Sequence, residues 1–372
     1  MSKRVIISGG GTGGHIFPAL AIAKALQRLD QQVEILFVGA LGRMEMDKVP
    51  AAGFQIIGLD IQGIQRKSLM KNLALPFKLI KSLLKARSIL KTFKPDVAVG
   101  VGGYASGPLL FAAANLNVPY LIQEQNSFAG LTNKWLAKKA EKICVAFDGM
   151  AAYFPQEKLL FTGNPIRKES VAIEGKRSEA AEFFGLSLDK KTVLITGGSL
   201  GAGTLNKAIK KDLKKLMNAD VQVIWQTGKY YYRAVLEELE NQLVPSVKIL
   251  EFLNRMDLAY AMADVIISRA GAGTIAELCV VGKPVILVPS PNVAEDHQTK
   301  NALSLSSKNA AILIEDAKAV QDLVPTVLTL LSDEKQAKEL SSSIAKLAIR
   351  NADEVIAKEI FRLMEKKGGQ WN

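Results

Sequence analysis

The chain has 372 residues and few of the side chains that bind metals or form disulfides. Its two cysteines, Cys144 and Cys279, each lie in an apolar segment, and we expect both to be small buried residues in a reducing compartment. Only two histidines occur, and no cysteine and histidine residues have the spacing of a metal site. The chain also lacks an Asp-x-Asp pair, which is one common way of holding Mg²⁺ on a nucleotide diphosphate. The sequence therefore offers no recognisable metal site.

Long apolar runs are missing as well. No uninterrupted apolar segment reaches the length that spans a bilayer. The first four residues lead at once into a strand pattern and a glycine loop, so we expect no cleavable signal peptide. A chain of this length is expected to form two α/β domains.

Acidic residues are absent between Asp60 and Asp96, where nine lysines and arginines are interleaved with large apolar residues. Residues 1–163 hold 20 basic and 10 acidic side chains, whereas residues 164–372 hold 28 and 26, so most of the net charge of +12 lies in the first part. The basic amphipathic segment at 64–94 can lie on an anionic membrane surface. The alternative is an ordinary surface helix that packs its apolar face on a sheet. Nucleic acid is disfavoured, because no aromatic stacking platform accompanies the charge.

The amino-terminal motif combines a short strand, a glycine turn and the start of a helix. Residues 5–8 form an apolar, β-branched run, five glycines occur at positions 9–14, and an amphipathic segment follows at 20–29. Glycine takes a positive φ without steric cost, and the start of a helix offers unpaired N–H groups to an anion. The motif predicts a site for a phosphate or another anion, with His15 at its mouth. The alternative is a generic turn with His15 on the surface.

The same glycines are spaced like a dinucleotide-binding fingerprint, because Gly9, Gly11 and Gly14 fit G-x-G-x-x-G. That fingerprint also needs an acidic residue at the end of the second strand to bind a ribose. Glu34 lies at about the right distance along the chain, but it stands at the start of the strand pattern at 33–38. The sequence therefore disfavours nicotinamide or flavin binding.

The opening plan is repeated in the second half of the chain, where a strand pattern at 193–196 leads into another glycine turn and a helix pattern. Two such starts predict two doubly wound α/β domains, which we place at residues 1–163 and 164–352, with a hinge in the turn at 163–165. A last helix at 353–372 is expected to pack back onto the first domain. Helical patterns lie between most strand patterns, so both sheets are expected to be mainly parallel. The strand patterns lie at 4–8, 33–38, 97–101, 118–122, 143–146, 159–162, 192–196, 221–226, 247–250, 264–268 and 284–288.

Two further polar loops follow predicted strands of the first domain. The glycine-rich segment at 100–108 is a second turn that suits a phosphate. Its candidate residues for binding a phosphate or another anion are Gly102, Gly103, Tyr104 and Ser106. The segment QEQN at 123–126 places four polar side chains after another strand. There, Glu124 or Asn126 can bind a substrate hydroxyl, and a structural cap is the alternative.

The second domain has a comparable segment, SRAGAGTIAE at 268–277, which runs from a strand into a helix through small residues. Thr274 near the helix start can donate to a phosphate, and Glu277 can reach ribose hydroxyls. The alternative for this pair is a capping box. Further along, Gln298 and Asn301 share one face of a predicted helix and can contact sugar hydroxyls.

Together these motifs resemble the MurG family of bacterial peptidoglycan glycosyltransferases, within glycosyltransferase family 28. The matching segments occur in order over nearly the whole chain. They are GGGTGGHIFPALA at 9–21, GVGGYASGP at 100–108, QEQN and AGLTNKWLAKKA within 123–140, TGNPIR at 162–167, GGSLGA at 197–202, SRAGAGTIAE at 268–277 and DHQTKNA at 296–302. The resemblance implies the GT-B fold, an α/β architecture of two Rossmann-like domains that face each other across a cleft.

The resemblance also implies a reaction. Members of this family transfer N-acetylglucosamine (GlcNAc) from UDP-GlcNAc to the C4 hydroxyl of undecaprenyl-diphospho-muramoyl-pentapeptide (lipid I), with inversion, and so form lipid II. We therefore expect a peripheral protein at the cytoplasmic face of the cell membrane, without a tightly bound metal or other cofactor. Other wall-synthesis proteins are expected partners.

The resemblance further assigns roles to residues of this chain. Those near the donor sugar would be Thr12, Gly13, Gly14, Asn126, Arg167 and Gln298. Those on the nucleotide would be Ser199 at the diphosphate, Leu253 through its backbone at the uracil, and Ala272, Gly273, Thr274, Ile275, Ala276 and Glu277 at the phosphate and ribose. Glu277 would bind the ribose hydroxyls. We expect no carried-over contact at His297, where the family often has glutamine.

The expected reaction needs a base for the acceptor hydroxyl and a positive field for the leaving diphosphate. His15 is the first candidate base, because a neutral imidazole suits that task near pH 7, and Glu124 is the second. His15 could instead only hydrogen-bond a sugar or a phosphate. The helix start near Thr274, with Ser199, could supply the positive field. Three other functions stay open: a glycosyltransferase that makes glycolipid from diacylglycerol, a UDP-sugar epimerase, and a non-catalytic UDP-sugar sensor.

Overall fold

A computed structural model describes residues 2–63, 75–198, 200–242 and 244–368 of the chain. The chain divides into two compact units. Unit 1 comprises Met1–Ile166 and Asn351–Asn372, and unit 2 comprises Arg167–Arg350. The division thus falls after Ile166, whereas the sequence places it after residue 163, because side-chain hydrogen bonds join Asn164 to the first sheet.

The described part of unit 1 contains a seven-stranded sheet in the order β3-β2-β1-β4-β5-β6-β7, and each pair of neighbours is parallel. Its strands are β1 (Arg4–Ser8), β2 (Glu34–Ala40), β3 (Gln55–Leu59), β4 (Val97–Gly100), β5 (Tyr120–Glu124), β6 (Lys142–Val145) and β7 (Leu159–Phe161). The strand order reverses at β1, which pairs with β2 on one side and β4 on the other. The loops after β1 and β4 therefore lie side by side at the carboxyl edge, where doubly wound sheets bind ligands.

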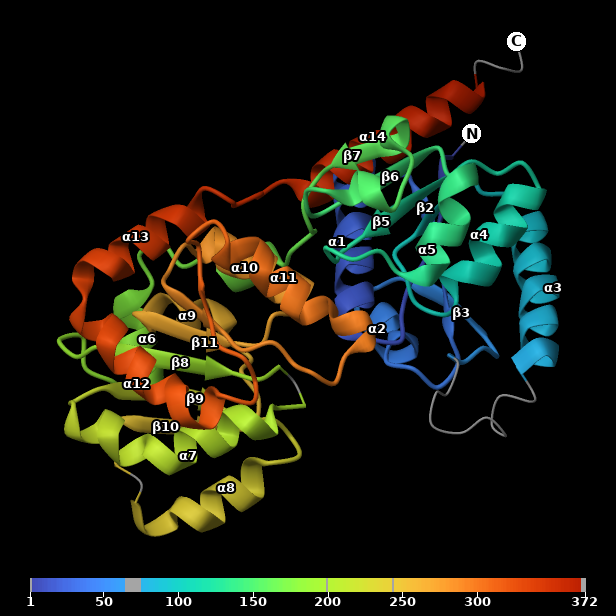
Figure 1. Cartoon of the computed structure of the whole chain (residues 1–372). Coiled ribbons are helices and arrows are strands. Elements are labelled where there is room, and N and C mark those ends of the chain that lie inside the picture. Colours follow the sequence, from blue (N-terminus) through green and yellow to red (C-terminus); the bar gives the residue numbers. More distant parts are fainter. Residues whose placement is uncertain (1, 64–74, 199, 243, 369–372) are drawn as a thin grey trace. The chain divides into compact units, whose positions relative to one another are not determined.

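Helices cover both faces of this sheet (Figure 1). The helices of unit 1 are α1 (Gly13–Leu29), α2 (Glu45–Ala51), α3 (Leu75–Phe93), α4 (Ser106–Asn115), α5 (Leu131–Leu136) and α14 (Ala352–Gly368), with 3₁₀ turns η2 (Ala137–Lys139), η3 (Met150–Ala152) and η4 (Gln156–Lys158). One apolar cluster joins α1 and α14 to the sheet, and another joins α3, α4 and α5 to the opposite face. Ile356 and Ile360 of α14 are fully buried in the first cluster. Residues 369–372 of the predicted last helix lie outside the described residues.

Helix α3 lies in the basic amphipathic segment, and residues 64–74 of that segment lie outside the described residues. The helix buries Leu90 and its neighbours against the sheet, as an ordinary surface helix would. It also leaves large apolar side chains in solvent, with Phe77 78% and Leu84 65% exposed. No helix among the described residues combines the length and the apolar character that crossing a membrane requires.

The described part of unit 2 contains a six-stranded parallel sheet in the order β10-β9-β8-β11-β12-β13. Its strands are β8 (Thr192–Thr196), β9 (Gln222–Gln226), β10 (Val247–Leu250), β11 (Val265–Ser268), β12 (Val285–Leu287) and β13 (Ile312–Leu313). Its helices are α6 (Arg177–Phe184), α7 (Gly203–Asn218), α8 (Tyr232–Leu239), α9 (Met256–Met262), α10 (Ala272–Val281), α11 (His297–Ser306), α12 (Ala319–Ser332) and α13 (Glu334–Ala345), with 3₁₀ turns η5 (Lys168–Val171), η6 (Glu240–Gln242) and η7 (Ala294–Asp296). The predicted fold class of two parallel-sheet, Rossmann-like domains is confirmed. Strands β3 and β13 were not predicted, and each lies at an edge of its sheet.

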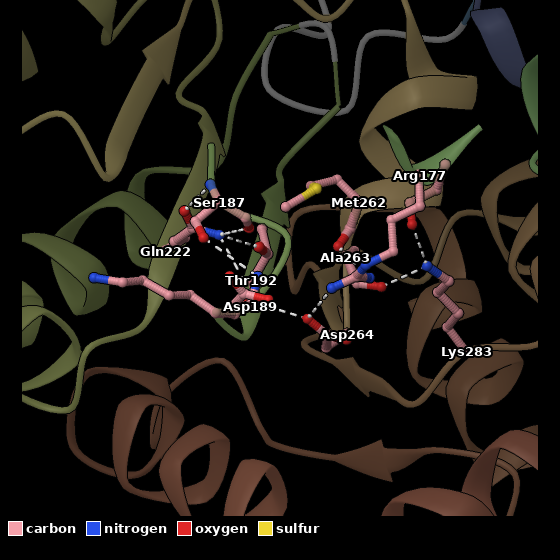
Figure 2. A network of polar contacts seen from close by, with 11 residues as sticks. Arg177, Ser187, Asp189, Thr192, Gln222, Met262, Ala263, Asp264 and Lys283 are labelled. Atoms are coloured by element: carbon pink, nitrogen blue, oxygen red, sulfur yellow. Dashed lines mark hydrogen bonds and ion pairs between the residues drawn. The ribbon is translucent and has the colours of Figure 1, made fainter. Parts of the chain in front are cut away.

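A polar network lies at the amino ends of strands in the second sheet, at the edge opposite the predicted ligand loops (Figure 2). The Asp264 carboxylate accepts the Thr192 N–H at 2.8 Å and an Arg177 N–H at 3.2 Å. The side chain of Gln222 bonds to both backbone groups of Ser187 and to the Thr192 hydroxyl. Burial lowers the pKa of Lys283 to about 8, with repulsion from Arg177 adding to the effect and Asp264 opposing it. Lys283 donates to two backbone carbonyls, so this network anchors chain segments around the sheet.

Candidate active site

The first glycine loop is tied to a buried carboxylate that the sequence did not single out. The chain leaves β1 at Ser8 and passes through Gly11, which has a φ of 84°. The Gly11 N–H donates to Glu45 Oε2 at 2.9 Å, and the Ala40 N–H donates to Oε1 at 3.0 Å. Glu45 is fully buried. One of the loop N–H groups that the sequence predicts for an anionic ligand is therefore already bound to a side chain of the protein.

His15 lies in the first turn of α1. Its Nδ1 is 3.1 Å from the Gly10 carbonyl oxygen and 3.1 Å from the Thr12 hydroxyl. Because a carbonyl oxygen only accepts hydrogen bonds, the contact with Gly10 is a hydrogen bond when Nδ1 carries the ring proton, whereas the Thr12 hydroxyl can either accept from Nδ1 or donate to it. The contact with Gly10 therefore favours the tautomer with the proton on Nδ1, in which Nε2 can accept a proton.

The loop after β4 packs closely on this histidine. Gly102 and Gly103 have φ values of 87° and 89°. A Cβ on Gly102 would lie 2.9 Å from Nε2 of His15, and a Cβ on Gly103 would lie 2.3 Å from the Gly10 oxygen. Glycine is required at both positions for the two loops to approach each other. The structure therefore brings the predicted base and the glycine-rich loop after β4 together.

The other two candidate residues of the loop after β4 differ in exposure. The Tyr104 side chain is 47% exposed and lies next to Gly11. Ser106 is fully buried, and its hydroxyl donates to the Gly103 carbonyl oxygen at 2.9 Å. The structure does not support a ligand contact for Ser106, because its side chain is used to fix the turn.

Glu124, the second candidate base, fixes a loop. Its side chain is 2% exposed. Its Oε1 accepts the Asn126 N–H at 3.1 Å, and its Oε2 accepts the Gly130 N–H at 3.0 Å and an Asn133 amide N–H at 2.8 Å. A buried carboxylate with these donors is poorly placed to take a proton from a substrate. The structure therefore favours the cap among the alternatives for Glu124, and Asn126 is a partly exposed member of the loop that Glu124 holds.

The remaining polar residues of this segment also serve the fold. Gln123 donates to Asn164 Oδ1 at 3.0 Å, and Asn164 donates to the Gln125 carbonyl oxygen at 2.8 Å. The Gln125 amide donates to the Val101 carbonyl oxygen at 2.9 Å. All three amide side chains are at most 3% exposed. This network links the end of β5 to the loop after β4, which is the loop that packs against His15.

In unit 2, helix α10 begins at Ala272 without a side-chain cap. Gly271 is the N-cap residue, so Thr274 lies inside the first turn and the capping box considered for Thr274 and Glu277 is wrong. A Cβ on Gly273 would meet no atom within 4 Å. The first turn of α10 therefore presents backbone N–H groups next to open space, which suits a phosphate.

Glu277 is one turn further along α10, and its side chain is 14% exposed. Its Oε1 is 3.6 Å from an Arg167 nitrogen, and its Oε2 accepts the Tyr260 hydroxyl at 3.4 Å. Burial raises the pKa of Glu277, and the Arg167 charge opposes that shift. Burial also raises the pKa of Tyr260 well above its ordinary value. Glu277 and Arg167, which the sequence assigns to the donor site, are therefore adjacent, and both contacts to the carboxylate are long.

The second glycine turn packs against the loop after β9. A Cβ on Gly201 would lie 2.0 Å from the Thr227 carbonyl oxygen, and one on Gly228 would lie 2.1 Å from the Gly201 nitrogen. These contacts explain why the turn needs glycine. Ser199, predicted to bind the diphosphate, lies outside the described residues.

An arginine that the sequence analysis missed links three loops of unit 2. Arg269 donates to the Val288 and Pro289 carbonyl oxygens, each at 3.0 Å, and forms an ion pair with Asp316. Asp316 also accepts the Thr204 hydroxyl at 2.9 Å. The loops after β11 and β12 are thus fixed to the start of α7. The only sequence feature that could have indicated this role is the position of Arg269 directly after a predicted strand.

The other residues predicted for the donor site differ in what they offer. The Leu253 side chain is 5% exposed, which is compatible with a role for its backbone. Gln298 Oε1 accepts the Ser290 N–H at 2.9 Å, which orients its amide. Asn301 is fully buried and donates to the Ala270 carbonyl oxygen at 3.3 Å, so the structure does not support the sugar contact predicted for it.

Comparisons with known proteins identify the family. The amino-terminal domain of glycosyltransferase family 28 matches residues 5–145, and the carboxy-terminal domain of that family matches residues 192–359. The chain belongs to glycosyltransferase family 28. This membership confirms the resemblance found in the sequence motifs.

Curated relatives of this family match along their whole length. One from Parabacteroides distasonis is 56% identical over 98% of this chain and 99% of the relative. One from Bacteroides fragilis is 54% identical over 97% of this chain and 96% of the relative. Both are named UDP-N-acetylglucosamine–N-acetylmuramyl-(pentapeptide) pyrophosphoryl-undecaprenol N-acetylglucosamine transferase.

A family 28 crystal structure is similar in fold. MurG from Acinetobacter baumannii superimposes with a TM-score of 0.78 at 31% identity, covering 97% of this chain and 99% of that chain. Within the ranges that the structure describes, no group of three or more histidine, cysteine, aspartate or glutamate residues is arranged to hold a metal ion.

Proposed function

We propose that the protein transfers GlcNAc from UDP-GlcNAc to the C4 hydroxyl of lipid I, with inversion, to give lipid II in peptidoglycan synthesis. The observation that carries this proposal is the 56% identity, over 98% of the chain, to a relative named for that transfer. The glycine-supported loops of both units, each at the carboxyl edge of a parallel sheet, are the local features that such a reaction would use. The diacylglycerol glycosyltransferase, the epimerase and the non-catalytic sensor have no comparable support.

Unit 2 is the proposed binding unit for the donor nucleotide. The first turn of α10, from Ala272 to Thr274, would bind phosphate through backbone N–H groups, together with Ile275 and Ala276 of the same segment. Glu277 would accept the ribose hydroxyls, and the Leu253 backbone would contact the uracil. We also place Arg167 and Gln298 near the donor sugar, and Ser199 near the diphosphate.

Unit 1 is the proposed acceptor unit and supplies the base. Nε2 of His15 would take the proton of the attacking C4 hydroxyl, since Nδ1 lies within hydrogen-bond distance of the Gly10 carbonyl oxygen. Thr12, Gly13, Gly14 and Asn126 would flank the transferred sugar. Gly102, Gly103 and Tyr104 would lie near the acceptor diphosphate. The leaving diphosphate would be stabilised by the α10 dipole and N–H groups, without a metal ion.

One transfer assay tests this function. The purified protein is incubated with labelled UDP-GlcNAc or UDP-galactose and a soluble lipid I analogue, with and without EDTA. We expect label to enter the lipid product only from UDP-GlcNAc and at a rate that chelation does not change. Transfer to diacylglycerol, release of an epimerised sugar without acceptor, or the absence of any turnover would each contradict the proposal.

We further propose that unit 1 associates with the cytoplasmic face of the cell membrane through α3, at the place where its lipid-linked acceptor is found. The support is the combination of exposed Phe77, Ile80 and Leu84 with exposed Lys81 and Arg87 on that helix. Apolar side chains would enter the headgroup region, and each base near an anionic surface contributes on the order of 1 kcal/mol. Other wall-synthesis proteins remain proposed partners.

Replacing two exposed apolar residues of α3 tests this association. The double variant Phe77→Ser and Leu84→Ser is expected to bind vesicles of anionic phospholipid roughly 30-fold more weakly, because about 2 kcal/mol of apolar burial is lost. Cosedimentation with the vesicles measures the effect, and turnover of the soluble lipid I analogue should not change. The matched control is Leu188→Ser, which removes a 48% exposed leucine from unit 2. Equal vesicle binding by the double variant and the wild type would exclude α3 as the contact.

A further inference from the structure

One peptide group of unit 1, between Gly10 and Gly11, is hydrogen-bonded at both ends to side chains. Its N–H, on Gly11, donates to Glu45 at 2.9 Å, and its carbonyl oxygen, on Gly10, lies 3.1 Å from His15 Nδ1. A carboxylate, a peptide and an imidazole therefore form one continuous chain of hydrogen bonds. The carboxylate and the imidazole come from different helices, α2 and α1.

The surroundings allow little variation in this arrangement. A Cβ on Gly10 would lie 2.2 Å from Glu45 Oε1, and a Cβ on Gly39 would lie 2.6 Å from Glu45 Cγ. The Glu45 side chain thus fits between the loop after β1 and strand β2 only because both Gly10 and Gly39 lack a side chain. Its other oxygen accepts the Ala40 N–H at the end of β2, so the carboxylate has a fixed position. A fully buried carboxylate that is bound to two backbone N–H groups acts in a medium where electrostatic effects are stronger than in water.

We propose that Glu45 is a positioning residue that acts on His15 through the Gly10–Gly11 peptide, fixing the imidazole proton on Nδ1 and strengthening Nε2 as a base. The negative charge at the N–H end polarises the peptide and makes the Gly10 oxygen a better acceptor. A better acceptor favours the Nδ1–H tautomer and stabilises the imidazolium that forms when Nε2 takes a proton. The role of Glu45 resembles that of a carboxylate that orients a catalytic histidine directly, with one peptide group inserted between them. The inference rests on the proposed function, in which His15 is the base.

The other charged side chains near the hydrogen-bonded chain from Glu45 to His15 are poorly placed to replace Glu45. On α2 and just before it, the charged neighbours of Glu45 are Arg43, Asp47 and Lys48, whose side chains are exposed to solvent. The neighbouring Tyr104 ring approaches Gly11, and Gln125, which directly follows β5 and carries no charge, donates to the Val101 carbonyl oxygen. Glu124 accepts its hydrogen bonds from the loop at 126–133. Glu45 is therefore a buried charge that hydrogen bonds connect to the histidine.

The tautomer of His15 in the wild-type protein is the first test. Because the chain has only two histidines, ¹⁵N NMR of the imidazoles can be assigned with the single variant His297→Gln. We expect the neutral ring of His15 to carry its proton on Nδ1. A proton on Nε2 in the wild type would overturn the proposal without any substitution at Glu45.

The variant Glu45→Gln is the second test, because it keeps the shape of the side chain and removes the charge. We expect the pKa of His15 to fall by about half a unit or more and the preference for the Nδ1–H tautomer to weaken. The acid limb of the kcat profile should move to lower pH by the same amount, while the KM for UDP-GlcNAc stays within about twofold. The control is Glu124→Gln, which neutralises another buried carboxylate of unit 1 and should leave the His15 titration unchanged.

These measurements separate the inference from the function on which it rests. If Glu45→Gln leaves the tautomer and the titration of His15 as they are in the wild type, the relay is wrong, whatever happens to turnover. If the titration shifts as expected but His15→Gln retains full turnover, the relay exists and the assignment of His15 as base is wrong. An equal shift in Glu124→Gln would show a general effect of buried charge and would also overturn the proposal.

Discussion

The variant His15→Gln is expected to lower kcat for GlcNAc transfer by roughly 10²- to 10⁴-fold, the usual contribution of a positioned general base. Glutamine can still donate to the Gly10 carbonyl oxygen, which lies 3.1 Å from Nδ1 of His15. It has no group that accepts a proton at neutral pH, so the loss of rate reports proton transfer. The KM for UDP-GlcNAc should change by less than about threefold, because the uridine and the diphosphate of the donor are assigned to unit 2. Steady-state rates with a soluble lipid I analogue measure both constants.

The same variant distinguishes the base from a residue that only hydrogen-bonds the substrate. If His15 merely donates to a sugar or a phosphate, the glutamine amide replaces that contact and more than about a tenth of the turnover is retained. For a base, His15→Ala should in addition regain activity when imidazole is supplied in solution. Near-normal turnover in both variants would remove His15 from the chemistry and leave the deprotonation of the acceptor to another group.

The parallel sheets and their ligand loops could be predicted because they depend on local patterns. Two short apolar strand patterns, which end at Ser8 and at Thr196, are each followed directly by a glycine turn, and this pattern allows few backbone conformations. The structure has both strands where the sequence predicts them. The two strands that were missed have weak local patterns. Strand β3 is interrupted by Gly58 and lies at a sheet edge, and β13 contains only two residues. Edge strands pair on one side only, so their sequences need a smaller apolar signal.

The buried polar residues of the site could not be predicted, because the sequence does not show which charged side chains the fold removes from water. Glu45 occurs among Arg43, Asp47 and Lys48, a mixed run that is typical of an exposed helix, yet it is fully buried. For Glu124, the sequence indicated a polar site but not the role of the carboxylate in it. A polar cluster after a strand is compatible with either chemistry or a cap, and only the four N–H groups around its carboxylate favour the cap.

Packing also decided which members of a recognised motif can reach a ligand. Ser106 and Asn301 belong to segments that the family motifs identify, but both are fully buried and hydrogen-bonded to backbone carbonyls. A motif therefore locates a loop without separating the residues that face the ligand from those that hold the loop. Gly102 and Gly103 illustrate the second kind, since their lack of side chains makes room for His15 and Gly10.

The variant Glu277→Gln is expected to weaken UDP binding by roughly 10- to 100-fold, because a hydrogen bond from a ribose hydroxyl to a charged carboxylate contributes about 1.5–3 kcal/mol. Isothermal titration with UDP, 2′-deoxy-UDP and 3′-deoxy-UDP measures the effect. The wild type should bind at least one deoxynucleotide about as weakly as the variant binds UDP, and the variant should no longer distinguish that nucleotide from UDP. A cycle of this kind isolates the contact between the carboxylate and one hydroxyl.

The surroundings of Glu277 supply both the control and a pH dependence. Tyr260→Phe removes the hydroxyl that lies 3.4 Å from Oε2 but keeps the carboxylate, so UDP affinity should fall by no more than about threefold. Burial raises the pKa of Glu277 and the charge of Arg167 opposes that shift, so the carboxyl stays neutral to a higher pH than that of an ordinary glutamate. The carboxylate is the stronger acceptor, so UDP affinity in the wild type should rise as pH increases through that pKa, and Glu277→Gln should abolish this rise. If the variant keeps the wild-type preference for UDP over both deoxynucleotides, Glu277 does not bind the ribose, and its ion pair with Arg167 serves only the fold of unit 2.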